Sequence, residues 1–289
     1  MKNKIKKQII FSLKIIITIL ILFFISKKID FYQLQKSFFQ ITFSTILIIF
    51  FTTFIKLFIQ YNNWGKYLQL NSDYVPKKYE ILKSYFVGMA LHFLLPAGLG
   101  LFGKMYFVNN KKRATAISVG VERIFVTWKN LFFASFAAIF FFQSINLFLK
   151  IIIFVFVTLL PFLFYLFGFL TKNQKIKLYF DNYLKIVPRI ITMQIIFVFI
   201  SFYQYFLILK TFVDIKFFDV IISVPIVHFS HIIPISFSGF GLREIFAMNV
   251  FSKFGISIEA AITTTLTIFF VNSVLPALVG LYLLLKAKR

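Results

Sequence analysis

Arg243 and Glu244 are adjacent charged residues inside a long apolar region of the chain. Charged side chains within a membrane are costly, and they usually face a cavity or each other. The stretch 231–242 just before them holds a proline, two glycines and two serines. One interpretation is that Arg243 contacts a phosphate beside a helix N-terminus, whose free N–H groups also favour anions, while Glu244 orients the arginine or carries a proton. The alternative is a structural ion pair that locks the turn.

A second polar group lies on the helix predicted by the apolar run 115–142. Glu122 and Lys129 share one row of that helix, and Arg123 and Asn130 share the neighbouring row, because the members of each pair are seven residues apart. This polar face could line a groove for a lipid headgroup. The alternative places Glu122 and Arg123 near the membrane interface, where they satisfy backbone groups of a broken helix.

Proline and glycine interrupt two apolar segments in the same way. Pro96 precedes Gly103 by the spacing with which Pro234 precedes Gly241, and a basic residue follows each break. A broken helix persists in a membrane only where it is buried in protein or lines a wet cavity. We therefore predict a substrate-binding set that combines the charged residues with the breaks: Arg243, Glu244, Glu122, Arg123, Lys104, Lys129, Pro234, Gly239, Gly241, Pro96, Gly98 and Gly100.

Lys104 takes the place of Arg243 in the first broken segment, where a lysine would contact a phosphate as a point charge. The alternative is that Lys104 only belongs to the basic cluster that continues to Arg113. Lys56 lies near the end of its apolar run and is expected to snorkel. Three histidines (His92, His228 and His231) are expected to be buried and hydrogen-bonded rather than zinc ligands. No metal or other cofactor is predicted.

Composition sets the class of protein. Of the 289 residues, 60% are hydrophobic and 14% are charged, and the mean hydropathy is +0.88. Continuous apolar runs predict a multi-span helical membrane protein and exclude a β-barrel, whose strands alternate. The net charge of +23 sits in short loops and at the chain ends, so it indicates topology and anionic headgroups rather than nucleic acid. The absence of cysteine excludes disulfides and thiol catalysis.

Apolar runs fall at about 9–26, 43–61, 81–101, 115–142, 148–170, 190–209, 218–251 and 260–285. If every run crossed the membrane, 81–101 would place the basic loop 104–113 outside, although basic loops stay in the cytoplasm. The charges agree with the rule if 81–103 and 218–251 each return to the side from which they enter, from opposite faces. The run 9–26 follows a basic N-terminus without a cleavage site and is predicted to be an uncleaved first span.

The predicted fold is therefore an all-α polytopic membrane protein with about six full spans and two re-entrant, oppositely oriented segments. It forms a single transmembrane domain, 1–289. The first repeat covers about 43–142 with its re-entrant segment 81–103, and the second covers about 190–285 with 218–251. Paired Gly/Pro-interrupted segments in two halves are typical of an inverted repeat with a membrane binding site.

The segment 234–244 reads Pro-x-Ser-x-x-Gly-x-Gly-x-Arg-Glu, and Gly255-Ile256 and an alanine pair follow it. This pattern resembles the lysylphosphatidylglycerol synthase transmembrane region, also called the flippase-like domain family. The first half is similar to the same family's Leu-Pro-x-Gly-x-Gly turn, followed by Glu122-Arg123. Two features depart from the family pattern. Phe102 and Lys104 stand where members often place an acidic residue and an arginine, and the second half lacks a Glu-Arg pair that matches Glu122-Arg123.

The resemblance implies a membrane module that moves an aminoacylated phospholipid, or another anionic or polyprenyl-linked lipid, between leaflets. It also implies that synthase activity resides in a separate cytosolic domain, so no enzymatic activity is expected of this chain. We expect a bacterial cytoplasmic (inner) membrane protein with both termini in the cytoplasm. Its expected partners are membrane lipids with an anionic headgroup, and further copies of the chain or envelope-assembly proteins are possible partners. The alternatives are an accessory subunit of an envelope or glycolipid assembly complex and an intramembrane glycosyl or lipid transferase.

Overall fold

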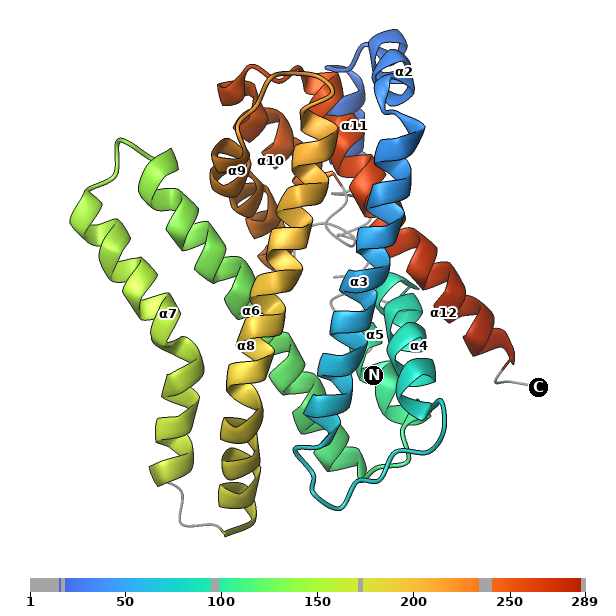
Figure 1. Ribbon diagram of the computed structural model, residues 1–289, viewed down its shortest axis with the longest axis vertical. Coiled ribbons are helices and arrows are strands. Elements are labelled where there is room, and N and C mark those ends of the chain that lie inside the picture. Colours follow the sequence, from blue (N-terminus) through green and yellow to red (C-terminus); the bar gives the residue numbers. More distant parts are fainter. Residues whose placement is uncertain (1–15, 17–18, 95–98, 171–173, 234–240, 287–289) are drawn as a thin grey trace.

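The computed structural model describes residues 16, 19–94, 99–170, 174–233 and 241–286 (Figure 1). Every regular element in these ranges is a helix, which confirms the prediction of an all-α fold. The α-helices are α2 (Phe31–Gln40), α3 (Phe43–Leu68), α4 (Glu80–Leu94), α5 (Leu99–Phe102), α6 (Lys112–Phe141), α7 (Leu147–Leu170), α8 (Gln174–Leu209), α9 (Phe217–Phe229), α10 (Leu242–Phe251), α11 (Ile258–Phe269) and α12 (Leu275–Lys286). Short 3-10 helices are η2 (Gly103–Phe107), η3 (Ser230–Ile232) and η5 (Ser252–Phe254), and η6 (Phe270–Val274) is a π-helix.

Four helices in the described part of the chain are long and apolar enough to cross a membrane: Phe43–Leu68, Lys112–Phe141, Lys177–Leu209 and Ile258–Lys286. They correspond to four of the six predicted full spans. Leu147–Leu163 is a shorter apolar helix, and most of the first run, 9–26, lies outside the described residues. The count of six spans therefore stays a prediction.

The long helices extend further than the apolar runs predict. α3 begins after Thr42, whose side chain accepts a hydrogen bond from the Thr45 N–H, and it continues to Leu68. α8 begins at Gln174, whereas the apolar run 190–209 predicts a later start. That expectation was wrong because lysine, glutamine and leucine are good helix formers even where the sequence is too polar to lie in lipid.

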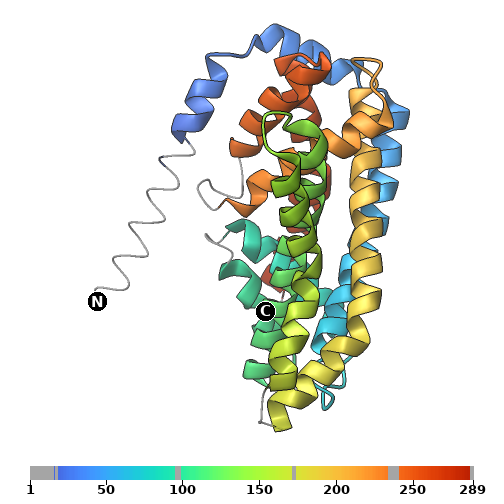
Figure 2. The ribbon, with the colours of Figure 1, turned by 90° about the vertical axis from the view of Figure 1, so that its left-hand side faces the viewer.

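Both predicted breaks separate short helices. α4 has 15 residues and α9 has 13, whereas about 20 are needed to span a bilayer. Four of the predicted break residues (Pro96, Gly98, Pro234 and Gly239) lie outside the described residues. Figures 1 and 2 place α4 and α5 together in the lower half of the bundle, and α9 and α10 together in the upper half.

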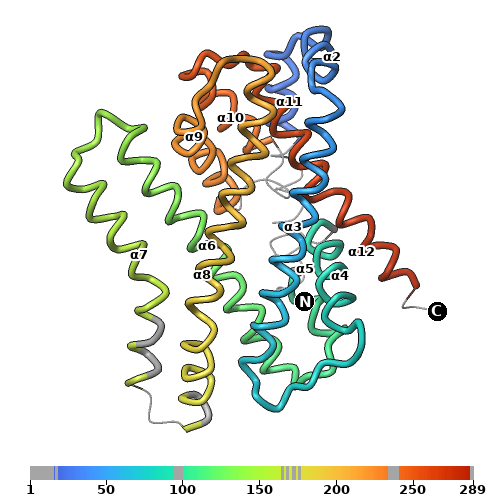
Figure 3. The backbone as a smooth tube through the Cα atoms, in the orientation of Figure 1, coloured from blue at the N-terminus to red at the C-terminus, as the bar shows by residue number. Residues whose placement is uncertain are grey.

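The two halves are joined by reciprocal packing. α12, at the end of the chain, packs on α4, whereas α6 packs on α9. Each long helix that follows one broken segment thus lies against the broken segment of the other half. Gly280 on α12 makes this approach close, because a Cβ at this position would overlap the Phe86 carbonyl of α4. Figure 3 shows the path of the last helices from α11 in the upper half to α12 in the lower half.

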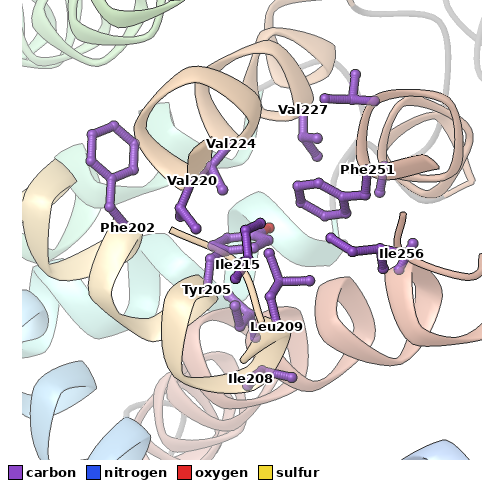
Figure 4. Close-up of a cluster of buried hydrophobic side chains, with 14 of the residues drawn as sticks. Phe202, Tyr205, Ile208, Leu209, Ile215, Val220, Val224, Val227, Phe251 and Ile256 are labelled. Atoms are coloured by element: carbon purple, nitrogen blue, oxygen red, sulfur yellow. The ribbon is translucent and has the colours of Figure 1, made fainter. Parts of the chain in front are cut away.

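Each half has its own apolar core. The upper core gathers residues of α8, α9, α10 and α11 with a few from α3 and α6, and Tyr205, Val224 and Phe251 are among its most buried members (Figure 4). The lower core is richer in aromatic rings and centres on Trp64 and Phe125. Large apolar side chains are also exposed along the outer faces of the long helices, and charged side chains are buried inside. An apolar exterior around a polar interior is what a lipid environment favours.

Candidate functional site

Lys104 and Glu122 form a buried ion pair in the lower half. Lys104 lies in η2, just after the first broken segment, and Glu122 lies on α6. The Lys104 Nζ is 2.6 Å from Glu122 Oε1 and 2.7 Å from Oε2, so it donates to both carboxylate oxygens. The two residues are 1% and 7% exposed. Hydrogen bonds between charged groups are the stronger ones, and burial weakens their screening by water.

Aromatic rings complete the surroundings of Lys104. Its Nζ lies 4.4 Å from the centroid of the Trp64 ring and 5.5 Å from that of Tyr85. Gly88 on α4 provides the space, because a Cβ at this position would overlap the Lys104 side chain. Lys104 therefore does not belong to the exposed basic cluster that runs to Arg113, and that alternative was wrong.

Arg243 and Glu244 form the corresponding buried pair in the upper half, at the start of α10. Glu244 Oε1 accepts hydrogen bonds from Arg243 Nε, at 3.0 Å, and from Arg243 Nη2. The other carboxylate oxygen accepts from the Gly241 N–H at 2.7 Å and so caps the helix. The guanidinium carbon lies 4.4 Å from the centroid of the Phe269 ring.

The predicted glycines have different roles. Gly241 adopts φ +84°, a left-handed conformation that favours glycine, and this lets its N–H face Glu244. Gly100 has no such φ and is instead a close-packing position, because a Cβ there would overlap the Leu91 backbone of α4. Gly98 and Gly239 lie outside the described residues, as do Pro96 and Pro234.

A third polar group, which the sequence-based prediction did not include, lies in the middle of α3. Lys56 is buried rather than snorkelling, and its Nζ donates to Gln204 Oε1 of α8 at 3.1 Å. Gln204 Nε2 donates in turn to the hydroxyls of Thr52 and Thr53. The signal was available, since these polar residues interrupt two apolar runs.

Asn272 links this polar group to the last helices. Its Nδ2 donates to Gln204 Oε1 at 3.0 Å, and its Oδ1 accepts from the Thr53 hydroxyl at 2.8 Å. Asn272 lies in the π-helix Phe270–Val274. π-helical turns inside α-helices are frequent at functional sites, because the extra residue redirects a side chain.

Lys129 completes the interior charges on α6. It is buried like Glu122, with which it was predicted to share one row of the helix, whereas Arg123 on the neighbouring row is exposed. The Lys129 Nζ lies 3.7 Å from the centroid of the Phe197 ring, and the Lys56 Nζ lies 4.7 Å from the same ring.

The predicted charged residues thus form two ion pairs rather than a single cluster, while Lys129 lies beside Lys56, which was not predicted, and Arg123 is exposed. Arg243, Lys129 and His92 all lie close enough for their charges to act on His231. In the part of the chain that the structure describes, no group of three or more histidine, aspartate or glutamate side chains is arranged to hold a metal ion.

Comparison with known proteins supports a membrane role. The model of the family described as the lysylphosphatidylglycerol synthase TM region matches residues 11–280. No curated protein and no solved structure matches at the threshold of these comparisons. The family match covers nearly the whole chain, including both broken segments, three of the four candidate spans and most of the fourth, Ile258–Lys286. The chain therefore belongs to the lysylphosphatidylglycerol synthase TM region family, whose members are multi-pass membrane proteins.

Proposed function

We propose that this protein is a lipid translocase that moves an anionic, aminoacylated or polyprenyl-linked lipid between the leaflets of the bacterial cytoplasmic membrane. The observation that carries the proposal is the buried Arg243 at the start of α10, directly after a broken segment. The buried Lys104 after the first broken segment is its counterpart in the other half. Buried cations beside helix breaks are suited to receive a phosphate.

The proposed path keeps the two parts of the lipid in different surroundings. Acyl or prenyl chains stay against the apolar outer faces of the long helices, where residues such as Phe54 on α3 are exposed. The headgroup passes through the polar interior. An arriving phosphate competes with Glu244 for Arg243, because both are oxoanions that a guanidinium binds through the same N–H groups. No bond is made or broken in this role.

The proposed topology uses two inverted repeats, about 43–142 and 190–285. Segments 81–103 and 218–251 enter the membrane from opposite faces and return, with both chain termini in the cytoplasm. The reciprocal packing of α12 on α4 and of α6 on α9 supports this proposal, because an internal two-fold relation requires such exchange. Each face of the membrane then has one break from which the headgroup can be reached.

Reconstitution tests the proposal. Purified protein is placed in vesicles with a fluorescent phosphatidylglycerol or lysylphosphatidylglycerol, and a membrane-impermeant quencher measures the outer-leaflet fraction over time. Arg243→Ala is expected to slow lipid movement about ten- to a hundredfold, since a charge-assisted hydrogen bond contributes about 1.5–3 kcal/mol.

Arg189→Ala is the matched control, because Arg189 is an exposed arginine of α8. The control should move lipid at the wild-type rate. Equal rates in Arg243→Ala and wild type would contradict the proposed role of Arg243. Wild-type protein that moves none of these lipids faster than empty vesicles would refute the translocase proposal. A stable stoichiometric partner would then favour an accessory role.

A further inference from the structure

Lys56 and Lys129 are two buried lysines that belong to none of the ion pairs of the described residues. Each is 6% exposed, and each lies near the middle of a long helix. All nine acidic side chains of the chain lie among the described residues. Of these, Glu122 is bound by Lys104 and Glu244 by Arg243, and no described carboxylate lies within 4.0 Å of either lysine nitrogen.

The two lysines also share one location. Both ammonium groups lie against the ring of Phe197, one from α3 and one from α6, and they are close enough to repel each other. A phenyl face attracts a cation but does not neutralise it. Two like charges that are buried without a counter-charge destabilise the fold. An anion bound between them would offset their repulsion and supply the missing counter-charge.

The two lysine ammonium groups offer more hydrogen-bond donors than their neighbours accept. An ammonium group carries three donors and no acceptor. Among the described residues, Lys56 uses one donor on Gln204 Oε1, and no hydrogen bond from the Lys129 Nζ is found. Gln204 Oε1 already accepts from Asn272 as well, so this acceptor is shared by two donors. A ligand that fits must therefore bring acceptors and negative charge.

The position of Lys56 is fixed before any ligand arrives. Gln204 is held by the hydroxyls of Thr52 and Thr53, and Asn272 in the π-helix holds both Gln204 and Thr53. These contacts tie α3, α8 and the last helices together around one ammonium group. A pre-organised donor binds an anion better because less conformational freedom is lost on binding.

We infer that Lys56 and Lys129 together form an oxoanion site in the membrane interior that binds a phosphate group. Its source is either the phosphodiester of an anionic lipid headgroup or free inorganic phosphate. The inference rests on the proposed function only where it names a lipid as the source. The site does not include Arg243, so it would give a lipid headgroup a second binding position in the membrane interior.

The test uses full-length protein in a neutral detergent and measures the midpoint of thermal unfolding. Three additions are compared: phosphatidylglycerol, diacylglycerol with the same acyl chains, and inorganic phosphate. Native mass spectrometry counts bound phosphatidylglycerol in parallel. Wild type is expected to melt several degrees higher with phosphatidylglycerol than with diacylglycerol. A rise with inorganic phosphate alone, and none with the lipid, would assign the site to free phosphate.

The decisive variants are Lys56→Met and Lys129→Met. Each should lose the rise caused by the anion and retain less lipid in the mass spectrometer. Without the anion each should melt at or above the wild-type temperature, because removal of one lysine ends the repulsion and Gln204 Oε1 keeps its bond from Asn272. Wild-type anion responses in both variants would overturn the inference.

Lys150→Met is the matched control, because Lys150 is also buried but its Nζ donates to the carbonyl groups of Ile139 and Phe142. This variant should melt lower and keep the full anion response. If a methionine variant does not fold, Lys129→Glu replaces it. The new carboxylate would face Lys56, so this variant should melt higher than wild type and ignore the anion. A full anion response in Lys129→Glu would also overturn the inference.

The failure of this inference can be separated from the failure of the proposed function. Suppose that the lysine variants lose the anion response and that wild-type protein moves no lipid. The oxoanion site would then be supported and the translocase proposal refuted. A wild type that moves lipid, together with lysine variants that respond like wild type, would refute the site and leave the translocase.

Discussion

The ion pairs of the two halves, Lys104–Glu122 and Arg243–Glu244, occupy corresponding places but are built differently. Lys104 and Glu122 are 18 residues apart and join η2 to α6. Arg243 and Glu244 are neighbours in the first turn of α10, and Glu244 also caps that turn through Gly241. The first pair is therefore a tertiary link, whereas the second travels with its own helix.

The difference assigns different tasks to the two halves. A large movement of η2 relative to α6 would break the two charge-assisted hydrogen bonds between Lys104 and Glu122. α10 can shift as a unit without losing the contact between Arg243 and Glu244. We therefore expect the first half to serve as the fixed part of the molecule and the second half to carry the changes that accompany a headgroup.

The largest effect is expected from Glu122→Ala. The substitution leaves Lys104 buried without its carboxylate, which costs about 3–5 kcal/mol of unfolding free energy. Unfolding by a denaturing detergent in mixed micelles measures the loss. The double variant Lys104→Met/Glu122→Leu should recover most of it, because an apolar pair needs no counter-charge. A loss of unfolding free energy below about 1 kcal/mol is typical of exposed pairs, and it would show that the Lys104–Glu122 pair does not hold the first half in place.

A smaller effect is expected from Gly88→Ala, which changes the packing of α4 against the Lys104 side chain. The added methyl overlaps the Lys104 side chain and should cost about 1–3 kcal/mol through overpacking. Gly120→Ala is the control, because a Cβ at Gly120 meets nothing within 4 Å. The control should be neutral or gain up to about 1 kcal/mol of helix propensity. Equal stabilities of the two variants in the same unfolding experiment would argue against the packing of Lys104 on α4.

Gly241→Ala tests the second pair. Its φ of +84° costs an alanine about 1–2 kcal/mol, and the added Cβ would also come within 2.6 Å of Ile21. Gly255 has φ +75° with nothing within 4 Å of an added Cβ, so Gly255→Ala incurs only the conformational cost. We expect Gly241→Ala alone to slow lipid movement in the vesicle assay, because the Gly241 N–H positions Glu244. Equal rates of lipid movement in Gly241→Ala and Gly255→Ala would show that the hydrogen bond from the Gly241 N–H to Glu244 is not needed for transport.

The smallest effect is expected from Lys111→Ala, which removes the third ion pair. Lys111 Nζ is 3.1 Å from Asp73 Oδ2, but the two side chains are 74% and 68% exposed. Water and salt screen such a pair, so the loss should be under about 1 kcal/mol and should vanish at high salt. A loss as large as that of Glu122→Ala would mean that burial does not decide the strength of these pairs.

Much of the fold was predictable from the sequence, because continuous apolar runs leave few options other than membrane helices. The position of Glu122 and Lys129 on one face of the helix followed from their spacing, whereas their burial did not. The burial of Lys104 was not predictable, since it depends on space beside Gly88 and on a carboxylate from another element. In the sequence, Lys104 looked like the first member of an exposed basic cluster.

Lys56 was misread for a related reason. The apolar run 43–61 placed it near an end, whereas α3 continues through buried Asn63 and Trp64 to Leu68 and puts Lys56 in the middle. Polar residues that pack inside a bundle end a hydropathy run without ending the helix. The contact of Asn272 with Gln204 was beyond prediction, because it requires a π-helical turn with no recognisable residue pattern.

That turn also sets the direction of everything after it. A π-helical turn holds one more residue than an α-helical turn, and one residue corresponds to about 100° of rotation about the helix axis. α11 packs on α2 and α10, and α12 then presents Gly280 to α4. The helix that runs from α11 to α12 thereby has two contact faces that point in different directions about its axis. Deletion of a single residue within 270–274 would straighten the helix and swing Gly280 away from α4, so the turn acts as an angular spacer between the two halves.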